Sequence, residues 1–331
     1  MKTRQLLPAM LAFAALNFAA CNNDENPTNF NDQVAAIISG SITNGTDNTD
    51  LVNAPQTRAS ATAWAEGDLI GISASSPAGI TAYTNIRYSA MNVAGNFEVA
   101  NASGEDNTIY FQDKKDVNFT AYYPHSGTNG TKPGTDGIIS HTITIDDQMA
   151  DRQPAIDFLW AQATANAANP QVQFRFAHTM SSIRLSFIEG DGVTFPAEGV
   201  TCTLAGLKLD GTFDTSDGTA TASSTAQTAD LGPAVATVPT GSTSFRTSLI
   251  VWPQQVAGVM LTVNVSGITT PFTAPLTFTD IAITGTSELL TGKSYTFNVK
   301  VEKTRIDVSQ ATITDWSEEW SSGNDTTVYP E

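Results

Sequence analysis

The chain has 331 residues, of which 40% are hydrophobic and 15% charged, and its formal net charge is −17. This length suits two domains behind an export segment, and the hydrophobic share is sufficient for packed cores. The strong negative charge repels phosphate backbones, which argues against nucleic acid as a partner.

The first 20 residues have the pattern of a secretory signal peptide. Lys2 and Arg4 precede an apolar run over residues 6–18, which is too short to span a bilayer in the mature protein. The run ends in FAAC, which resembles the processing site of bacterial lipoproteins. We therefore expect removal of residues 1–20 and acylation of Cys21, with palmitate among the fatty acids; an ordinary cleavage that leaves Cys21 incidental is the alternative.

Residues 21–33 are polar and acidic, and they predict an unfolded tether. The only other cysteine is Cys202, and an acylated Cys21 cannot form a disulfide with it. Cys202 lies in the strand-like segment VTCTLAGLKL, where a small buried hydrophobe is expected rather than a nucleophile.

The first predicted strand is Val34–Ile42, and a polar loop with an isolated Arg58 follows it. An arginine between small residues suits a trypsin-like protease, and a solvated loop arginine fits equally well. Short strands separated by Gly, Asn, Asp and Pro then continue to Ala163, a spacing typical of a sandwich or barrel. In VNFTAYYP, alternation places Val117, Phe119, Ala121 and Tyr123 on one face.

The stretch from Val172 to Phe187 reads as a long strand whose apolar face changes midway. The first face holds Val172, Phe174, Phe176 and Met180, and the second holds Ile183, Leu185 and Phe187. A strand changes face only through a bulge or a crossing between sheets. We therefore predict a boundary between two β-domains, with the change at Ser181 and Ser182.

Beyond a linker-like loop over residues 189–199, a second series of strand patterns runs to Trp316. The clearest is KSYTFNVKV, which predicts one apolar face and one wet face. The apolar face would hold Tyr295, Phe297, Val299 and Val301. Trp252, Trp316 and Trp320 could form an aromatic platform for sugar, although core packing is the expected role of the first two.

No group of side chains in the sequence predicts catalysis. His178 and His141 lie in strand patterns and His125 in an exposed loop, so structural or solvent roles are expected. The acidic loop LDGTFDTSDG departs from the EF-hand spacing and predicts a hairpin turn rather than a calcium site. We therefore expect no enzymatic activity, no metal and no cofactor.

Several segments, taken in order, resemble the fimbrillin family of Bacteroidia, the lipoprotein-derived subunits and accessory adhesins of type V pili. These segments are TRASATAWAEGDLIGI, VNFTAYYP, DFLWA, FRFAHTMSSIRLSF, LAGLKLDGTFD, GKSYTFNVKV and ATITDW. The resemblance implies an all-β fold of two tandem transthyretin-like (Greek-key) β-sandwich domains. It also implies a surface-exposed lipoprotein of the outer membrane, anchored in lipid through Cys21 and assembled into a fimbrium with other fimbrial subunits.

The resemblance further implies cleavage after Arg58 and loss of the strand in residues 34–58. A strand from a neighbouring subunit would then fill the vacancy. Its source would be the stretch from Arg305 to Trp316 or the tail, with donor candidates Ile306, Val308, Ile313, Val328 and Tyr329. The expected domains are residues 34–188 and 189–316, followed by a tail over 317–331. The alternative function is a non-polymerising surface lipoprotein that binds carbohydrate.

Overall fold

The computed structural model describes residues 33–43, 63–77, 79–101, 105–149, 151–195, 200–224, 228–231, 244–278 and 287–316. Within these ranges the chain consists of β-strands, turns and two short 3-10 helices, η1 (Asp146–Gln148) and η2 (Gln153–Ala155), without an α-helix. Its buried side chains form two hydrophobic clusters. The first cluster includes Ile38, Trp64 and Phe176 and lies in the barrel described below. The second cluster includes Leu185, Leu204 and Phe297, and the strands around it are here called the second region. The all-β prediction is therefore confirmed.

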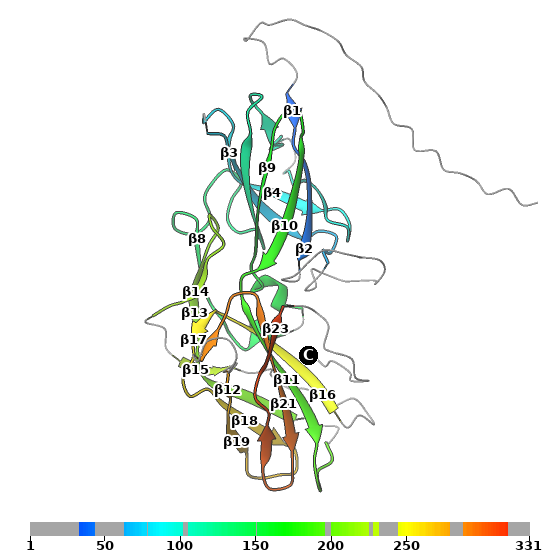
Figure 1. Cartoon of the computed structure of the whole chain (residues 1–331), viewed down its shortest axis with the longest axis vertical. Coiled ribbons are helices and arrows are strands. Elements are labelled where there is room, and N and C mark those ends of the chain that lie inside the picture. Colours follow the sequence, from blue (N-terminus) through cyan, green and yellow to red (C-terminus); the bar gives the residue numbers. More distant parts are fainter. Residues whose placement is uncertain are drawn as a thin grey trace, which may run out of the picture. The chain divides into compact units, whose positions relative to one another are not determined.

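Seven strands around the first cluster hydrogen-bond into a closed barrel (Figure 1). In the order of pairing they are β10 (Gln171–His178), β2 (Ile37–Thr43), β5 (Asn96–Val99), β4 (Ala82–Ala90), β3 (Leu69–Ser75), β7 (Val117–Tyr123) and β9 (Leu159–Ala165). The pairing of β10 with β2 is parallel, and the other pairings are antiparallel.

The alternation predicted for β7 is confirmed, because Val117, Phe119 and Ala121 are buried in the first cluster. Tyr122 lies on the opposite face of β7, and it is buried in the second cluster. Its hydroxyl donates to Asn85 Oδ1 at 2.7 Å, which satisfies the polar end of the ring.

The predicted change of face is also confirmed, slightly earlier than expected. β10 ends at His178, and β11 (Ser181–Glu189) begins in another sheet. Phe176 packs in the first cluster as predicted, but Met180, which was predicted for the same face, packs in the second. The change falls at Thr179, whose backbone N and Oγ1 both donate to Phe158 O, at 2.9 and 2.8 Å.

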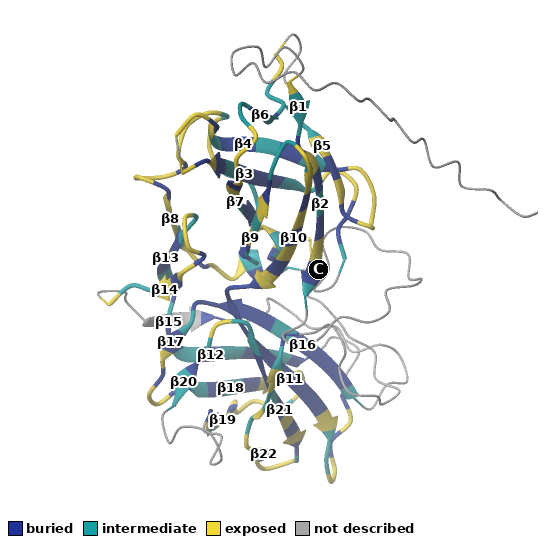
Figure 2. Cartoon of the chain, turned by 45° about the horizontal axis from the view of Figure 1, so that its top comes forward, coloured by how far each residue is buried: buried dark blue, intermediate teal, exposed yellow. Residues whose placement is uncertain are grey.

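Two sheets of the described chain contribute most of the second cluster. One contains β16 (Ser244–Val251), β11, β21 (Lys293–Val301), β22 (Ile306–Val308) and β23 (Thr312–Asp315). The other contains β15 (Thr228–Leu231), β12 (Val200–Lys208), β18 (Met260–Val265) and β19 (Phe272–Pro275). Leu185 of β11 and Leu204 of β12 belong to the same cluster, and Figure 2 shows the buried residues along both sheets.

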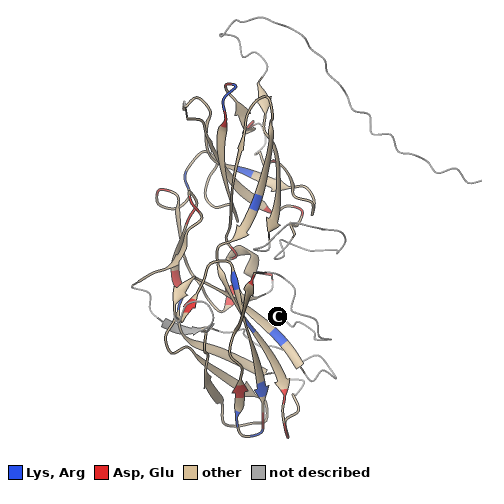
Figure 3. Ribbon diagram, in the orientation of Figure 1, with Lys and Arg blue, Asp and Glu red and all other residues tan. Residues whose placement is uncertain are grey.

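β21 has the apolar face predicted for it, since Tyr295, Phe297, Val299 and Val301 are fully buried. Ser294 was expected on the wet face and is buried as well. The charged residues of the described chain are spread over strands and turns of both regions (Figure 3).

Smaller ladders complete the fold. β8 (Ile138–Thr142), β13 (Asp210–Asp214) and β14 (Ala220–Ala222) form one sheet, and two-stranded ladders join β1 (Val34–Ala35) to β6 (Tyr110–Phe111) and β17 (Gln254–Gln255) to β20 (Glu288–Leu289). The hairpin of β13 and β14 confirms the turn predicted for the acidic loop. β8 pairs with β13, and Phe158 packs in the second cluster, although both precede residue 188 in the sequence. The two hydrophobic clusters are therefore not divided at residue 188. The number of domains stays a prediction.

Candidate functional site

β2 is held in the barrel from both sides. β10 pairs with the whole of β2 in parallel, and β5 pairs with Ile38 and Ser39 in antiparallel. Ile38 and Ile42 lie in the first cluster, where they are only 3% and 5% exposed. The predicted strand Val34–Ile42 is thus confirmed as β1 and β2, with Ala36 between them.

Two glycines allow β2 to lie close to the rest of the barrel. Gly40 N donates to Gly95 O at 2.8 Å, and Trp64 Nε1 donates to Gly40 O at 2.7 Å. Gly95 has a φ of +73°, and a Cβ on it would collide with Gly40 O. A Cβ on Gly40 would lie 2.8 Å from the ring of Phe176. Sequence reasoning missed this contact, since an isolated glycine in a strand indicates a close approach without naming the partner.

The rings beneath β2 form an apolar group centred on Trp64. Its centroid lies 5.1 Å from that of Phe97 and 5.0 Å from that of Phe176, both edge to face. Trp64 is 1% exposed. Removal of β2 would leave β5 and β10 with unpaired backbone edges and would uncover an apolar slot between them.

Four residues predicted to act in anchoring, processing or donation lie outside the described residues: Cys21, Arg58, Val328 and Tyr329. The described chain stops at Thr43, the end of β2, and resumes at Ala63. Arg58 therefore belongs to the connection between β2 and the other barrel strands. The roles predicted for these residues stay predictions.

The described C-terminal donor candidates, Ile306, Val308 and Ile313, lie in β22 and β23 of the five-stranded sheet. β22 pairs with residues 299–301 of β21, and β23 pairs with residues 293–296. Between them, Ser309 N donates to Asn298 O at 2.9 Å. Ile306 is buried, while Val308 and Ile313 are half-buried. Among the strands that the structure describes, β21 is the one that pairs with this stretch, and Ala311 N also donates to Thr277 O at 3.3 Å. Removal of the stretch would therefore leave one unpaired strand edge rather than two.

Trp316 connects the end of this stretch to the end of β10. Its ring stacks on the imidazole of His178, with 4.6 Å between centroids and 1° between planes. His178 Nδ1 also lies 2.9 Å from Asp157 Oδ1. These contacts confirm the structural roles predicted for both residues.

The cysteine and histidine residues considered for chemistry lie in buried or half-buried positions. Burial raises the pKa of Cys202 to about 12, so the thiol is protonated and unreactive at neutral pH. His125 is half-buried rather than exposed, and burial together with Arg87 lowers its pKa. Trp252 is fully buried in the second cluster, as predicted. Within the described ranges, no group of three or more His, Cys, Asp and Glu side chains could hold a metal ion.

The described part of the chain also lacks a helix long and apolar enough to cross a bilayer. Among known proteins, the fimbrillin-like family matches residues 57–316. A crystal structure assigned as a cell adhesion protein from Bacteroides ovatus ATCC 8483 is 32% identical, with a TM-score of 0.72, and the match covers 87% of this chain and 99% of that one.

A second crystal structure, assigned as a cell adhesion protein from Bacteroides uniformis ATCC 8492, is 21% identical with a TM-score of 0.64. That match covers 88% of this chain and 100% of the other, and it supports the fold alone. Curated proteins yield no match. The extent of the family match and the 32% identity show that this chain belongs to the fimbrillin-like family.

Proposed function

We propose that the chain reaches the outer membrane as a lipoprotein acylated on Cys21 and acts as a fimbrial subunit or adhesin, with the lipid anchor retained unless the chain is cleaved after Arg58. Family membership implies a location at the cell surface. The FAAC motif and the polar tether support lipid anchoring through Cys21. The assignment of the Bacteroides ovatus relative as a cell adhesion protein supports the adhesive role.

The placement of β2 is the observation that carries the assembly mechanism. β2 contributes a complete ladder to β10 and two buried isoleucines to the first cluster. Its only covalent link to the later barrel strands passes through Arg58. Cleavage after Arg58 would allow β2 to leave, and a strand from another subunit would restore the ladder and cover the slot. The family match begins at residue 57, so β2 lies outside the matched stretch.

The geometry of the slot restricts which strand could replace β2. A Cβ at the position of Gly40 would lie 2.8 Å from the Phe176 ring, so the entering strand must have glycine there, or alanine together with a small shift of that ring. Between Arg305 and Trp316, Ala311 is the smallest residue, and Ile313 follows it by two positions, as Ile42 follows Gly40. We therefore favour a donor register with Ala311 in the place of Gly40, drawn from a second copy of this chain.

Limited digestion of the full chain with a trypsin-like protease tests the assembly mechanism. We expect an N-terminus at Ala59 and an SDS-resistant ladder on unheated gels, both abolished in Arg58→Ala and the ladder also abolished by truncation after Arg305. An acylated Cys21 on surface-isolated protein, without cleavage, would instead indicate an anchor or uncleaved adhesin.

The donor register is tested by Ala311→Phe, with Thr312→Phe as the matched control because Thr312 is exposed. Ala311→Phe should prevent ladder formation in protein whose circular dichroism is native, whereas Thr312→Phe should polymerise. Normal ladders from both variants would exclude this register.

A further inference from the structure

The barrel is closed between β9 and β10 by a short pairing alone. These strands pair only at Ala177 with Trp160 and at His178 with Leu159. No ladder pairing joins residues 161–165 to residues 171–176, although β9 stays paired with β7 and β10 with β2, and Asn166 and Asn169 form an isolated bridge at the turn. This unpaired stretch is here called the β9–β10 opening. Because backbone groups point alternately to the two sides of a strand, part of the N–H and C=O groups of residues 161–165 and 171–175 face this opening.

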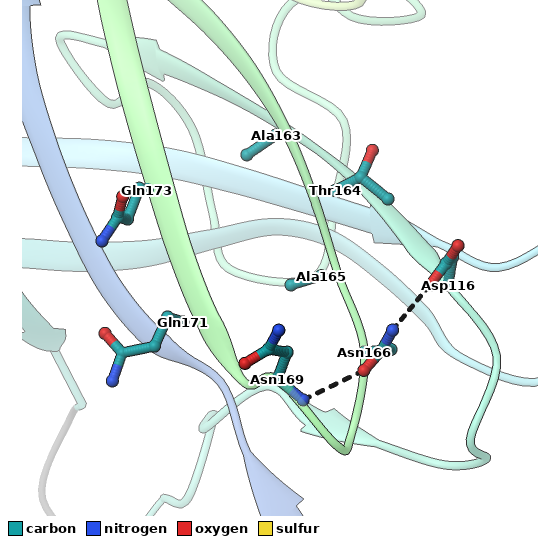
Figure 4. Close-up of a pocket in the computed structure, with 8 residues that line it drawn as sticks. All are labelled: Asp116, Ala163, Thr164, Ala165, Asn166, Asn169, Gln171 and Gln173. Carbon is teal, nitrogen blue, oxygen red and sulfur yellow. Dashed lines mark hydrogen bonds between the residues drawn. The ribbon is translucent and has the colours of Figure 1, made fainter.

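A cavity of about 530 Å³ lies at the opening (Figure 4). Its volume falls within the range of small-molecule sites, roughly 300–1,000 Å³, but its lining is mostly polar. The lining residues are Asp116, Ala163, Thr164, Ala165, Asn166, Asn169, Gln171 and Gln173. The short side chains of Ala163 and Ala165 leave room for a ligand to approach the strand backbone.

One side of the cavity is already fixed by internal hydrogen bonds. Asn166 Nδ2 donates to Asp116 Oδ1 at 2.7 Å, and Asn166 Oδ1 accepts from Asn169 N at 3.0 Å. These contacts hold the β9–β10 turn and occupy one oxygen of the carboxylate. The turn is therefore a preorganised wall, which lowers the entropic cost of binding.

The other side presents amide groups with unused hydrogen-bonding capacity. The side chains of Asn169, Gln171 and Gln173 are exposed, and among the described residues none of them has a hydrogen-bond partner. Each amide has a carbonyl acceptor and an NH₂ donor. Such paired donors and acceptors match the hydroxyl groups of a sugar, each of which can both donate and accept.

The charge of the lining selects among sugars. Asp116 is the one ionisable residue that lines the cavity, and Lys or Arg do not contribute to it. A sialylated or sulfated sugar would lack a cationic partner here, whereas a neutral sugar requires none. An added peptide strand is less suitable, because strand addition gains specificity from side-chain pockets that this polar opening does not provide.

We propose that the β9–β10 opening is a binding site for neutral oligosaccharides. This proposal rests on the proposed adhesive function, since a shallow polar site binds weakly in one copy and its overall affinity rises when many copies are displayed together. The lining residues lie outside residues 34–58, so the site is retained whether or not the chain is cleaved.

An array of immobilised neutral, sialylated and sulfated oligosaccharides tests the proposal. The probe is the full-length Arg58→Ala chain, which stays uncleaved at that site, coupled to beads that display many copies. We expect binding to neutral members. Combined Gln171→Ala and Gln173→Ala should reduce it at least about tenfold, which corresponds to 1.4 kcal/mol. Gln162→Ala is the control, because Gln162 is exposed on β9 but does not line the cavity.

Absence of binding to every neutral member, equal binding by the double variant, or a preference for charged members would overturn the proposal. Thermal unfolding of each variant identifies any loss that arises from misfolding. Because the sugar test uses Arg58→Ala, which cannot be processed at that site, a lack of sugar binding does not bear on donor-strand assembly. A lack of SDS-resistant ladders likewise does not bear on the sugar site.

Discussion

The barrel and the second region hold their terminal strands in different ways. β2 lies between two barrel strands and contributes isoleucines to the first cluster, whereas β22 and β23 cover one edge of β21. Loss of an inserted strand opens a closed ladder, while loss of an edge strand shortens a sheet. In the proposed assembly mechanism, β2 is the strand whose loss creates a vacancy, and β22 and β23 are the strands available to fill one.

Removal of the segment that contains β2 should have the largest effect. If the chain is cut after Arg58 and separated from the fragment, loss of two buried isoleucines should cost the barrel about 3–6 kcal/mol. Hydrogen exchange should then rise in β5 and β10, and an added peptide of residues 34–43 should restore protection. The contrast fails if truncation after Arg305 exposes these barrel strands equally.

The fit of β2 against β5 can be tested at Gly95. Gly95→Ala should destabilise the chain by about 2–4 kcal/mol, combining positive φ with overpacking against Gly40 O. Gly79→Ala is the matched control, because Gly79 has a φ of +70° but no atom within 4 Å of a new Cβ. It should cost only about 1 kcal/mol in urea unfolding. Equal losses would mean that backbone conformation alone matters.

The contact between the C-terminal stretch and β10 should have a smaller effect. His178→Ala removes the stacking on Trp316 and the bond to Asp157, so we expect a loss of about 1–3 kcal/mol. Hydrogen exchange should increase in residues 306–316 more than in β2. His141→Ala, at a more exposed histidine, should cost at most about 0.5 kcal/mol. A similar response to both variants would remove His178 from this role.

The smallest predicted effect is a loss of stability at alkaline pH, to which each of the two hydrophobic clusters contributes through one buried group. Burial raises the pKa of Cys202 in the second cluster from 9.0 to about 12, and that of Tyr88 in the first from 10.0 to about 12. Above the ordinary pKa of each group, 9.0 for the thiol and 10.0 for the phenol, the unfolded chain loses a proton that the folded chain keeps. The free energy of unfolding therefore falls as pH rises.

At pH 10 the thiol should therefore account for a loss of roughly 1 kcal/mol relative to pH 8. Urea midpoints at the two pH values measure this loss, and Cys202→Ala should show a smaller decrease than the unmodified chain. An equal decrease would assign the alkaline sensitivity to other groups.

Much of the strand content could be predicted because burial of one face leaves a period of two in the sequence. That signal identified the apolar face of β21, the interior face of β7 and the face change before β11. It failed at Ser294 and did not reveal the burial of Tyr122, since a strand pattern does not report whether a second layer covers the outer face. Candidate residues in the tether, the loop around Arg58 and the tail came from local motifs and remain untested.

The sequence by itself determined the all-β class, the approximate strands and the lack of common catalytic motifs, because these depend on local periodicity and composition. Tertiary structure decided that β2 pairs in parallel with β10, that Gly40 meets Gly95, and that the part of β9 and β10 without ladder pairing lines a polar cavity. Each of these joins segments through space rather than along the chain. Strand partners are selected by the packing of the whole core, so no local pattern could name them.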